Sequence, residues 1–291
     1  MRTQLLEKRS WQDFGDIPCT GEIDPVTWDR PLADNSESQP SSLAGFIAID
    51  VVPGLVLAHR SSLRASKPDD DAAQIVDEFA ALVLAQETPA LMSYVETLRL
   101  RGATIETLYL GLLSATARRL GEFWEEDSVD FASVTIGLWR LQEVLRNLSA
   151  AFQIEGPKPA HGHRALLLST AGEQHNFGLA MLGEFLFRDG WSVAGGPGLK
   201  PAEISGLLQA EFFSIVGLSL SCESRIEALT STIRLIRRSS INRNIVVMVG
   251  GAAFIQHPEL VAAVGADATA PDARHGALHA ERVINSLGSS R

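Results

Sequence analysis

Three short segments of the chain hold the side chains that could form a ligand site. They are residues 173–178 (Glu-Gln-His-Asn-Phe-Gly), residues 219–221 (Ser-Leu-Ser) and residues 250–251 (Gly-Gly). Each follows a short apolar stretch that predicts a buried strand. Because ligands of parallel sheets bind at the carboxyl ends of the strands, we expect the three segments to meet in one crevice.

His175 is the side chain of this set that could bind a metal ion, since imidazole is the commonest metal ligand in proteins. The two cysteines, Cys19 and Cys222, form no C-x-x-C pair, so zinc and iron–sulfur sites of the common kinds are not expected. The loop after the first strand also lacks the glycine patterns of phosphate-binding loops. The alternative interpretation is that His175 only begins a helix and binds no ligand.

Taken together, the three segments resemble the signature of cobalamin-binding domains, D-x-H-x-x-G followed by S-x-L and then G-G. The lengths of the intervening stretches, residues 179–218 and 222–249, suit that family. Glu173 stands where the family has Asp, and Ser221 stands where Leu is usual. Glu is one methylene longer than Asp, so the pairing of carboxylate and histidine can still form.

The resemblance implies a role for each residue. His175 would displace the dimethylbenzimidazole base as the lower axial ligand of cobalt (base-off, His-on), and Glu173 would hold its other ring nitrogen. Gly178 would let the backbone pass close under the corrin. Ser219 would hydrogen-bond the displaced base, and residues 250–251 would leave room for the tail. The predicted cofactor-binding residues are Glu173, His175, Asn176, Phe177, Gly178, Ser219, Ser221, Gly250, Gly251 and Trp124, with His175 as the metal ligand. The cofactor would be hydroxo-, methyl- or adenosylcobalamin.

The elements that must position these residues follow from the apolar pattern between residues 162 and 288. Strands are expected at 165–169, 191–194, 214–219, 245–249 and 268–269, and helices at 177–188, 201–208, 224–238, 257–264 and 273–287. Strand–helix alternation with nearly all-apolar strands predicts a doubly wound parallel sheet, Rossmann-like or flavodoxin-like, covered on both faces. We therefore expect an α/β cobalamin-binding domain at 162–288.

Residues 70–155 predict an all-α domain, a four-helix bundle with short connections. Corrinoid proteins often place such a bundle before the cobalamin domain, as a cap over the upper face of the cobalt. Trp124 matches the cap tryptophan of cobalamin photoreceptor regulators, although the core of the bundle is its alternative place. Val134 and Thr135 stand where those regulators carry Glu-His, so no upper ligand is expected from this helix. Trp139 is expected in the core.

Residues 1–69 predict an extension that contains a polar linker at 34–42. Neither a signal peptide nor an apolar run of membrane-spanning length is present, so a cytoplasmic protein is expected.

The formal net charge of −10 argues against direct binding to nucleic acid. Five arginines lie between residues 225 and 243, and we interpret them as a solvated helix face with its following loop. They are Arg225, Arg234, Arg237, Arg238 and Arg243. For Cys222, beside the crevice, both small-residue packing and a redox role stay open.

Residues 224–251 and 257–273 are similar to the AerR/PpaA family of purple photosynthetic bacteria, and the resemblance extends over about residues 75–287. It implies a regulator rather than an enzyme: an antirepressor that binds a CrtJ/PpsR-type repressor and relieves its block on photosystem and pigment genes. Cobalamin would make this interaction responsive to light, and redox state would contribute.

The chain shows no methyl-transfer domain, mutase barrel or helix-turn-helix module. A corrinoid shuttle of a methyltransferase system and a scaffold that has lost its cofactor are the alternatives.

Overall fold

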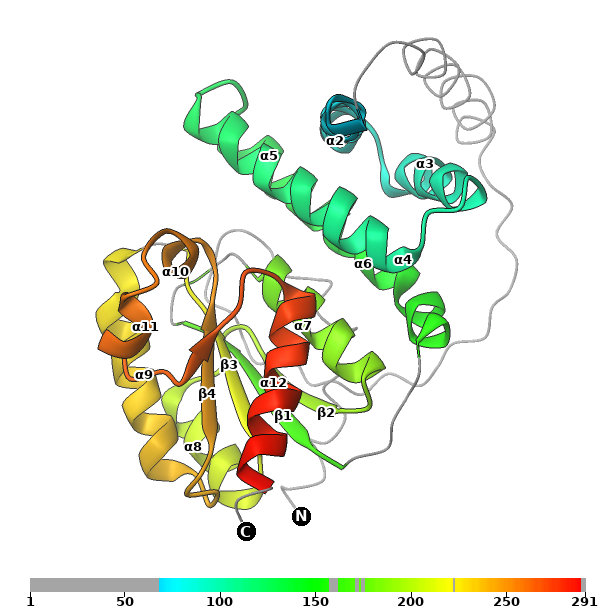
Figure 1. Ribbon diagram of the computed structural model, residues 1–291. Coiled ribbons are helices and arrows are strands. Elements are labelled where there is room, and N and C mark those ends of the chain that lie inside the picture. The colour runs from blue at the N-terminus through cyan, green and yellow to red at the C-terminus, as the bar shows by residue number, and fades with distance from the viewer. Residues whose placement is uncertain (1–67, 157–161, 171–172, 174–175, 222, 289–291) are drawn as a thin grey trace. The chain divides into compact units, whose positions relative to one another are not determined.

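The computed structural model describes residues 68–156, 162–170, 173, 176–221 and 223–288 (Figure 1). The chain divides into two compact units between Ala151 and Phe152. The first unit is helical over its described part, and the second is an α/β unit. The predicted metal ligand His175, residues 1–67 of the predicted extension, and Cys222 lie outside the described residues.

The helical unit contains α2 (Pro68–Ala85), α3 (Thr88–Leu100), α4 (Ile105–Thr107), the π-helical segment η3 (Leu108–Leu113), α5 (Ser114–Glu125) and α6 (Phe131–Glu155). The segments α4, η3 and α5 follow one another without a break, so they form one long helix. Asp130 begins α6, because the Ser133 backbone N–H donates to its carboxylate at 2.9 Å. That bond and a second one from the Ser133 hydroxyl hold the pKa of Asp130 below its ordinary value.

The apolar faces of these helices form the core of the helical unit. Its buried side chains include Phe79, Val83, Leu91, Val95, Ile105, Leu113, Leu120, Leu141, Leu145 and Leu148. Arg140 of α6 adds a polar tie, since its Nη1 donates to the backbone carbonyls of Val83 (2.6 Å) and Leu84 (3.1 Å) near the end of α2. The prediction that Trp139 lies in the core is wrong. It is 42% exposed, because the stripe of α6 that carries Leu141, Leu145 and Leu148 leaves Trp139 on another side of the helix.

A five-stranded sheet forms the centre of the α/β unit. The strands are β1 (Arg164–Ser169), β2 (Ser192–Gly196), β3 (Ile215–Ser219), β4 (Val246–Gly250) and β5 (Ala268–Thr269). All neighbouring pairs are parallel, and the strand order is β2-β1-β3-β4-β5. This order is flavodoxin-like, as predicted, and places the topological switch point between β1 and β3.

Helices connect the strands and cover both faces of the sheet. They are α7 (Phe177–Arg188), α8 (Pro201–Ala210), the short 3₁₀ turn η4 (Glu223–Arg225), α9 (Ile226–Ser239), α10 (Ala252–Gln256), α11 (Leu260–Ala263) and α12 (Ala273–Gly288). The helix expected at 257–264 is shorter, since only α11 lies in that range, and α10, which precedes it, was not predicted from the sequence. His257 ends α10, and Pro258 lies in the turn before α11.

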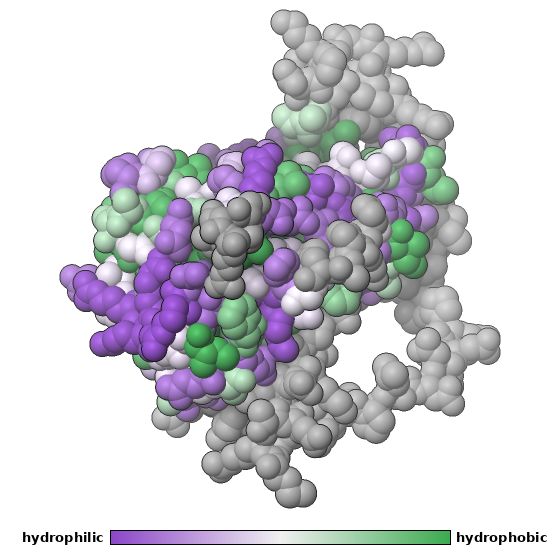
Figure 2. Space-filling model, turned by 60° about the horizontal axis from the view of Figure 1, so that its bottom comes forward, coloured by the Kyte–Doolittle hydropathy of each residue, from purple (hydrophilic) through white to green (hydrophobic). Residues whose placement is uncertain are grey.

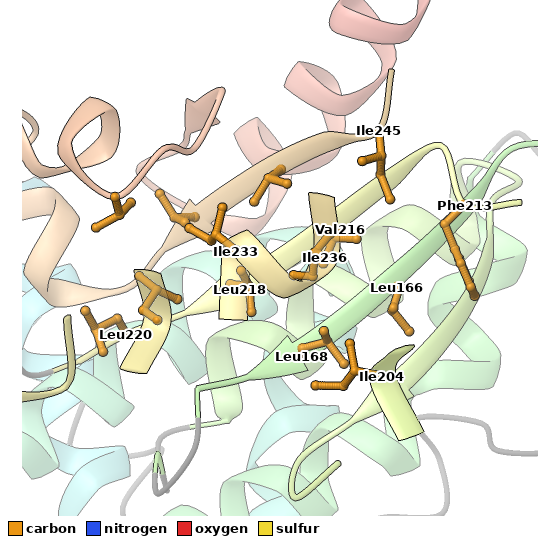
Figure 3. Close-up of a cluster of buried hydrophobic side chains, with 14 of the residues drawn as sticks. Leu166, Leu168, Ile204, Phe213, Val216, Leu218, Leu220, Ile233, Ile236 and Ile245 are labelled. Atoms are coloured by element: carbon orange, nitrogen blue, oxygen red, sulfur yellow. The ribbon is translucent and has the colours of Figure 1, made fainter. Parts of the chain in front are cut away.

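One face of the sheet packs against α8 and α9 (Figure 3). Alternate strand residues such as Leu166, Leu168, Val216 and Leu218 point into this layer, and Figure 3 shows Ile204, Ile233 and Ile236 of the two helices among them. Since each buried aliphatic side chain contributes about 1.5–3 kcal/mol, this layer fixes the sheet firmly.

The other face of the sheet is covered by α7, which also packs against α12 (Figure 1). Gly217 of β3 leaves the space that this packing needs. A Cβ there would lie 2.7 Å from Leu167 Cδ2 and 3.6 Å from Leu182 Cδ2 of α7. The strands and helices therefore hold the carboxyl edge of the sheet in a rigid frame. Among the residues that the structure describes, no helix is both long and apolar enough to cross a membrane.

Candidate functional site

The ends of three adjacent strands form a single row at the carboxyl edge of the sheet. The parallel register pairs Ser169 of β1 with Ser219 of β3, and pairs Ser219 with Gly250 of β4. The row therefore crosses the switch point between β1 and β3, where ligands of this architecture bind. The structure thus brings together the described members of the three segments that the sequence singled out.

Glu173 and Ser221, the two residues that depart from the cobalamin-domain pattern, contact each other. The Ser221 backbone N–H donates to Glu173 Oε2 at 2.9 Å, and the Ser221 hydroxyl donates to the same oxygen at 2.7 Å. The Glu173 side chain is fully buried, whereas Ser221 is half-buried. A buried carboxylate needs such donors, because an unsatisfied one is costly. Ser221 therefore supplies two donors, whereas a Leu at this position could supply only the backbone N–H.

Arg225 and Thr170 also belong to this site, although no motif in the sequence points to either of them. Arg225 Nη1 lies 3.7 Å from Glu173 Oε1, so a positive charge faces the buried carboxylate. Thr170 is 1% exposed, and its hydroxyl donates across the switch point to the carbonyl oxygen of Ser219 at 2.9 Å. The position of Thr170 immediately after an apolar strand is the one signal that could have identified it.

The start of α7 lies beside the same row. The Ser169 hydroxyl donates to Asn176 Oδ1, which ties the end of β1 to the residue that precedes α7. Phe177 is 8% exposed and so belongs to the core, while Gly178 is exposed. The predicted assignment of Asn176 and Phe177 to cofactor contact stays a prediction. What the structure gives them is a role in fixing the helix start.

Three glycines of the site differ in what the protein requires of them. Gly251 has φ +103°, and a Cβ there would lie 2.3 Å from the Leu220 carbonyl oxygen, so the backbone itself demands glycine. Gly178 and Gly250 have no positive φ, and a Cβ at either would meet no atom of the described residues within 4 Å. Glycine near the start of a helix costs stability relative to alanine. The protein's own packing therefore gives no reason for Gly178 or Gly250.

Trp124, the remaining predicted site residue, lies on the surface of the helical unit. It lies in the last turn of α5 and is 51% exposed. The alternative that it packs in the core of the bundle is therefore wrong. Its assignment to the cofactor stays a prediction.

Comparisons with known proteins agree with this architecture. Residues 163–278 match the B12 binding domain family. A Rhodobacter capsulatus protein, described as an uncharacterized 20.5 kDa protein in the bchF-crtJ intergenic region, is 30% identical over 171 residues, which are 58% of this chain and 87% of that protein. The monomethylamine corrinoid protein of Methanosarcina barkeri superimposes with a TM-score of 0.63 at 15% identity, over 72% of this chain and 99% of its own. At that identity the last likeness shows the fold alone.

The sequence likeness and the strand-end geometry lead to the same assignment. The matched range, residues 163–278, contains all three strand ends of the row and the Glu173–Ser221 contact. The relative from Rhodobacter capsulatus is covered over most of its length. The chain therefore belongs to the family of that bchF-crtJ intergenic-region protein, as the AerR/PpaA resemblance predicts, and it carries a B12 binding domain.

Proposed function

We propose that the protein is a cobalamin-binding, light-responsive regulator, in which residues 162–288 bind the cofactor and residues 70–155 form the cap. The observation that carries the cofactor proposal is the open space at Gly178 and Gly250, beside the switch-point row. A flat macrocycle and its tail need close approach to backbone at two places, and glycine provides that approach. The residues of the described site therefore fit the group.

The chain's own residues would share the work as follows. His175 would bind the cobalt through one ring nitrogen, and Glu173 would accept a hydrogen bond from the other and so fix the tautomer. Ser221 already holds Oε2 of Glu173, so we assign Oε1 to this contact. Arg225, at 3.7 Å from Oε1, would place a positive charge beside the carboxylate. Ser219 and residues 250–251 would receive the displaced base.

A regulatory role for the bound group is supported by the relative that is described by its place between bchF and crtJ. When bound, cobalamin would supply a visible chromophore whose cobalt–carbon bond is broken by light. We propose that illumination of the loaded protein alters a surface that binds a CrtJ/PpsR-type repressor, so that the protein acts as an antirepressor of photosystem and pigment genes. In this proposal the protein is not an enzyme.

Reconstitution with hydroxocobalamin tests the cofactor assignment. We expect wild-type protein to retain the cofactor through gel filtration with a base-off, His-on spectrum, and His175→Ala to lose both the spectrum and at least about tenfold in affinity, as is typical when a metal ligand or its partner is removed. His279→Ala is the matched control, since His279 lies on α12 and its Nδ1–H donates to the Thr269 carbonyl oxygen at 3.0 Å. An unchanged spectrum in His175→Ala would falsify the ligand assignment.

Binding to the repressor tests the regulatory half of the proposal separately. Wild-type protein loaded with methyl- or adenosylcobalamin in the dark should change its affinity for a purified CrtJ/PpsR-type repressor after illumination, whereas His175→Ala should not. A protein that binds cobalamin, ignores the repressor and turns over methyl groups with a methyltransferase would instead be a corrinoid shuttle. A protein that retains no cobalamin at all would be a scaffold without its cofactor.

A further inference from the structure

The outer side of α9 borders an open hollow with a basic rim. The hollow has a volume of about 440 Å³ and lies between α9 and the end of α11. Its lining residues are Thr230, Ile233, Arg234, Arg237, Arg238 and residues 262–265. Figure 2 shows hydrophilic side chains over much of the side of the α/β unit on which Figure 1 places α9. This hollow lies away from the switch-point row and shares no residue with the site described above.

The floor of the hollow is apolar and rigid. Ile233 is 2% exposed and Val264 is 3% exposed, and both belong to the core layer beneath α9. Figure 3 shows Ile233 among the packed side chains of that layer. Ala262 and Ala263 are exposed at the edge and add only methyl groups. An apolar side chain placed here would therefore meet a fixed hydrophobic surface rather than mobile chain.

The three arginines of the rim are not equivalent. Arg237 is held by the protein, because its guanidinium donates to the Asp267 carboxylate at 2.9 Å and to the Gly265 carbonyl at 2.8 Å. Arg234 and Arg238 are exposed, and within the described residues neither has a hydrogen bond or ion pair. They are one helical turn apart, so their like charges repel each other by a few tenths of a kcal/mol. On a chain with a net charge of −10, this is a local excess of positive charge that nothing in the described structure neutralises.

We propose that this hollow, the α9–α11 hollow, binds an acidic segment of a partner protein that places one apolar side chain on Ile233 and Val264. Two carboxylates of the partner would pair with Arg234 and Arg238, whose planar guanidinium groups suit bidentate contacts with carboxylate oxygens. Nucleic acid fits the surface less well, because among the described residues only two unpaired arginines line the rim, whereas binding to a phosphate backbone draws on many cationic contacts. The apolar floor likewise favours a peptide over a free phosphate. This inference stands apart from cobalamin binding and from the identity of any repressor.

Titration of the full-length protein with a synthetic peptide tests the proposal. The probe is a peptide in which glutamates flank a single leucine on one helix face, and the signal is the Ile233 methyl resonance of isotope-labelled protein. We expect a saturable shift of Ile233, and binding that is about tenfold weaker in Arg234→Glu/Arg238→Glu, since two exposed ion pairs become repulsions. A peptide with lysines in place of the glutamates should regain binding to that double variant.

Two matched variants separate local from general effects. Arg118→Glu/Arg243→Glu changes the net charge equally at exposed positions outside the hollow, and it should bind the peptide as the wild type does. Arg234→Gln/Arg238→Gln removes the charges without placing acids near the end of α9, so it reports on binding if the Glu variant is poorly folded.

Three results would overturn the proposal. The first is no saturable shift of Ile233 with the peptide. The second is equal binding of a peptide whose leucine is replaced by serine, because the apolar floor would then play no part. The third is a stronger effect on Ile233 from inorganic phosphate or a short DNA duplex than from the peptide, which would make the hollow a site for anions rather than for an acidic protein segment.

Discussion

At the scale of single residues, the most informative feature is the contact between Glu173 and Ser221. Each residue alone departs from the D-x-H-x-x-G and S-x-L pattern, yet together they form a pair of hydrogen bonds around a fully buried carboxylate. The longer Glu side chain reaches the loop that follows β3, where the Ser221 hydroxyl donates a hydrogen bond to it. The two departures from the pattern are therefore coupled, because the longer carboxylate of Glu173 is bound by the hydroxyl of Ser221.

This coupling predicts non-additive stability. Ser221→Leu removes the hydroxyl donor from Glu173 Oε2 but keeps the backbone N–H, and it should lower the unfolding free energy of the cofactor-free protein by about 1.5–3 kcal/mol, the usual contribution of a hydrogen bond to a charged group. Glu173→Asp/Ser221→Leu restores the family pattern and should lose less than the sum of the two single variants. Urea unfolding followed by circular dichroism measures this, with Ser231→Leu on the exposed side of α9 as the control. Strictly additive losses would contradict the coupling.

At the scale of elements, the apolar pattern predicts the doubly wound sheet but not where each strand ends. The alternation of strands and helices predicted the doubly wound sheet, because burial on both faces leaves a continuous apolar run in each strand. Strand β2 extends beyond its predicted end at Ala194, since Gly195 and Gly196 carry no side chain to signal a strand, although they pair with Leu167 and Leu168 of β1. Likewise, no local pattern in the chain could reveal a contact such as Glu173–Ser221, which depends on how two loops meet.

The end of β4 gives a prediction at this scale, because its two glycines have different reasons to be glycine. Gly251→Ala should lower the unfolding free energy by about 2 kcal/mol or more, since its φ is positive and its new Cβ would overlap the Leu220 carbonyl. Gly250→Ala should change stability by less than about 1 kcal/mol, because its Cβ meets open space.

The effect of substitution on cobalamin affinity should differ from its effect on stability. Gly250→Ala, and also Gly178→Ala near the start of α7, should leave a stable protein that binds hydroxocobalamin more weakly than the wild type. Thermal unfolding and cofactor titration of the three variants give both quantities. Undiminished cofactor binding by both stable variants would show that the open space at these glycines serves another purpose.

At the scale of the whole molecule, cofactor binding and folding of the α/β unit must be linked. A ligand that binds the folded state alone stabilises it by about 2.7 kcal/mol when its free concentration is roughly 100 times Kd. Hydroxocobalamin should therefore raise the unfolding midpoint of the α/β unit in a concentration-dependent manner. Differential scanning calorimetry can follow this transition, and His175→Ala should show little of the increase. A midpoint that rises equally in the variant would mean that His175 contributes no binding energy.

The Glu173–Ser221 contact also makes the two routes of single substitutions between the family pattern and this chain unequal. From a chain with Asp and Leu at the two positions, a first step to Glu173 would place a longer carboxylate beside a leucine that has no hydroxyl to donate. A first step to Ser221 would leave only a half-buried hydroxyl, which water can satisfy. The second order passes through the less damaged intermediate. We therefore expect Glu173→Asp to destabilise the protein less than Ser221→Leu.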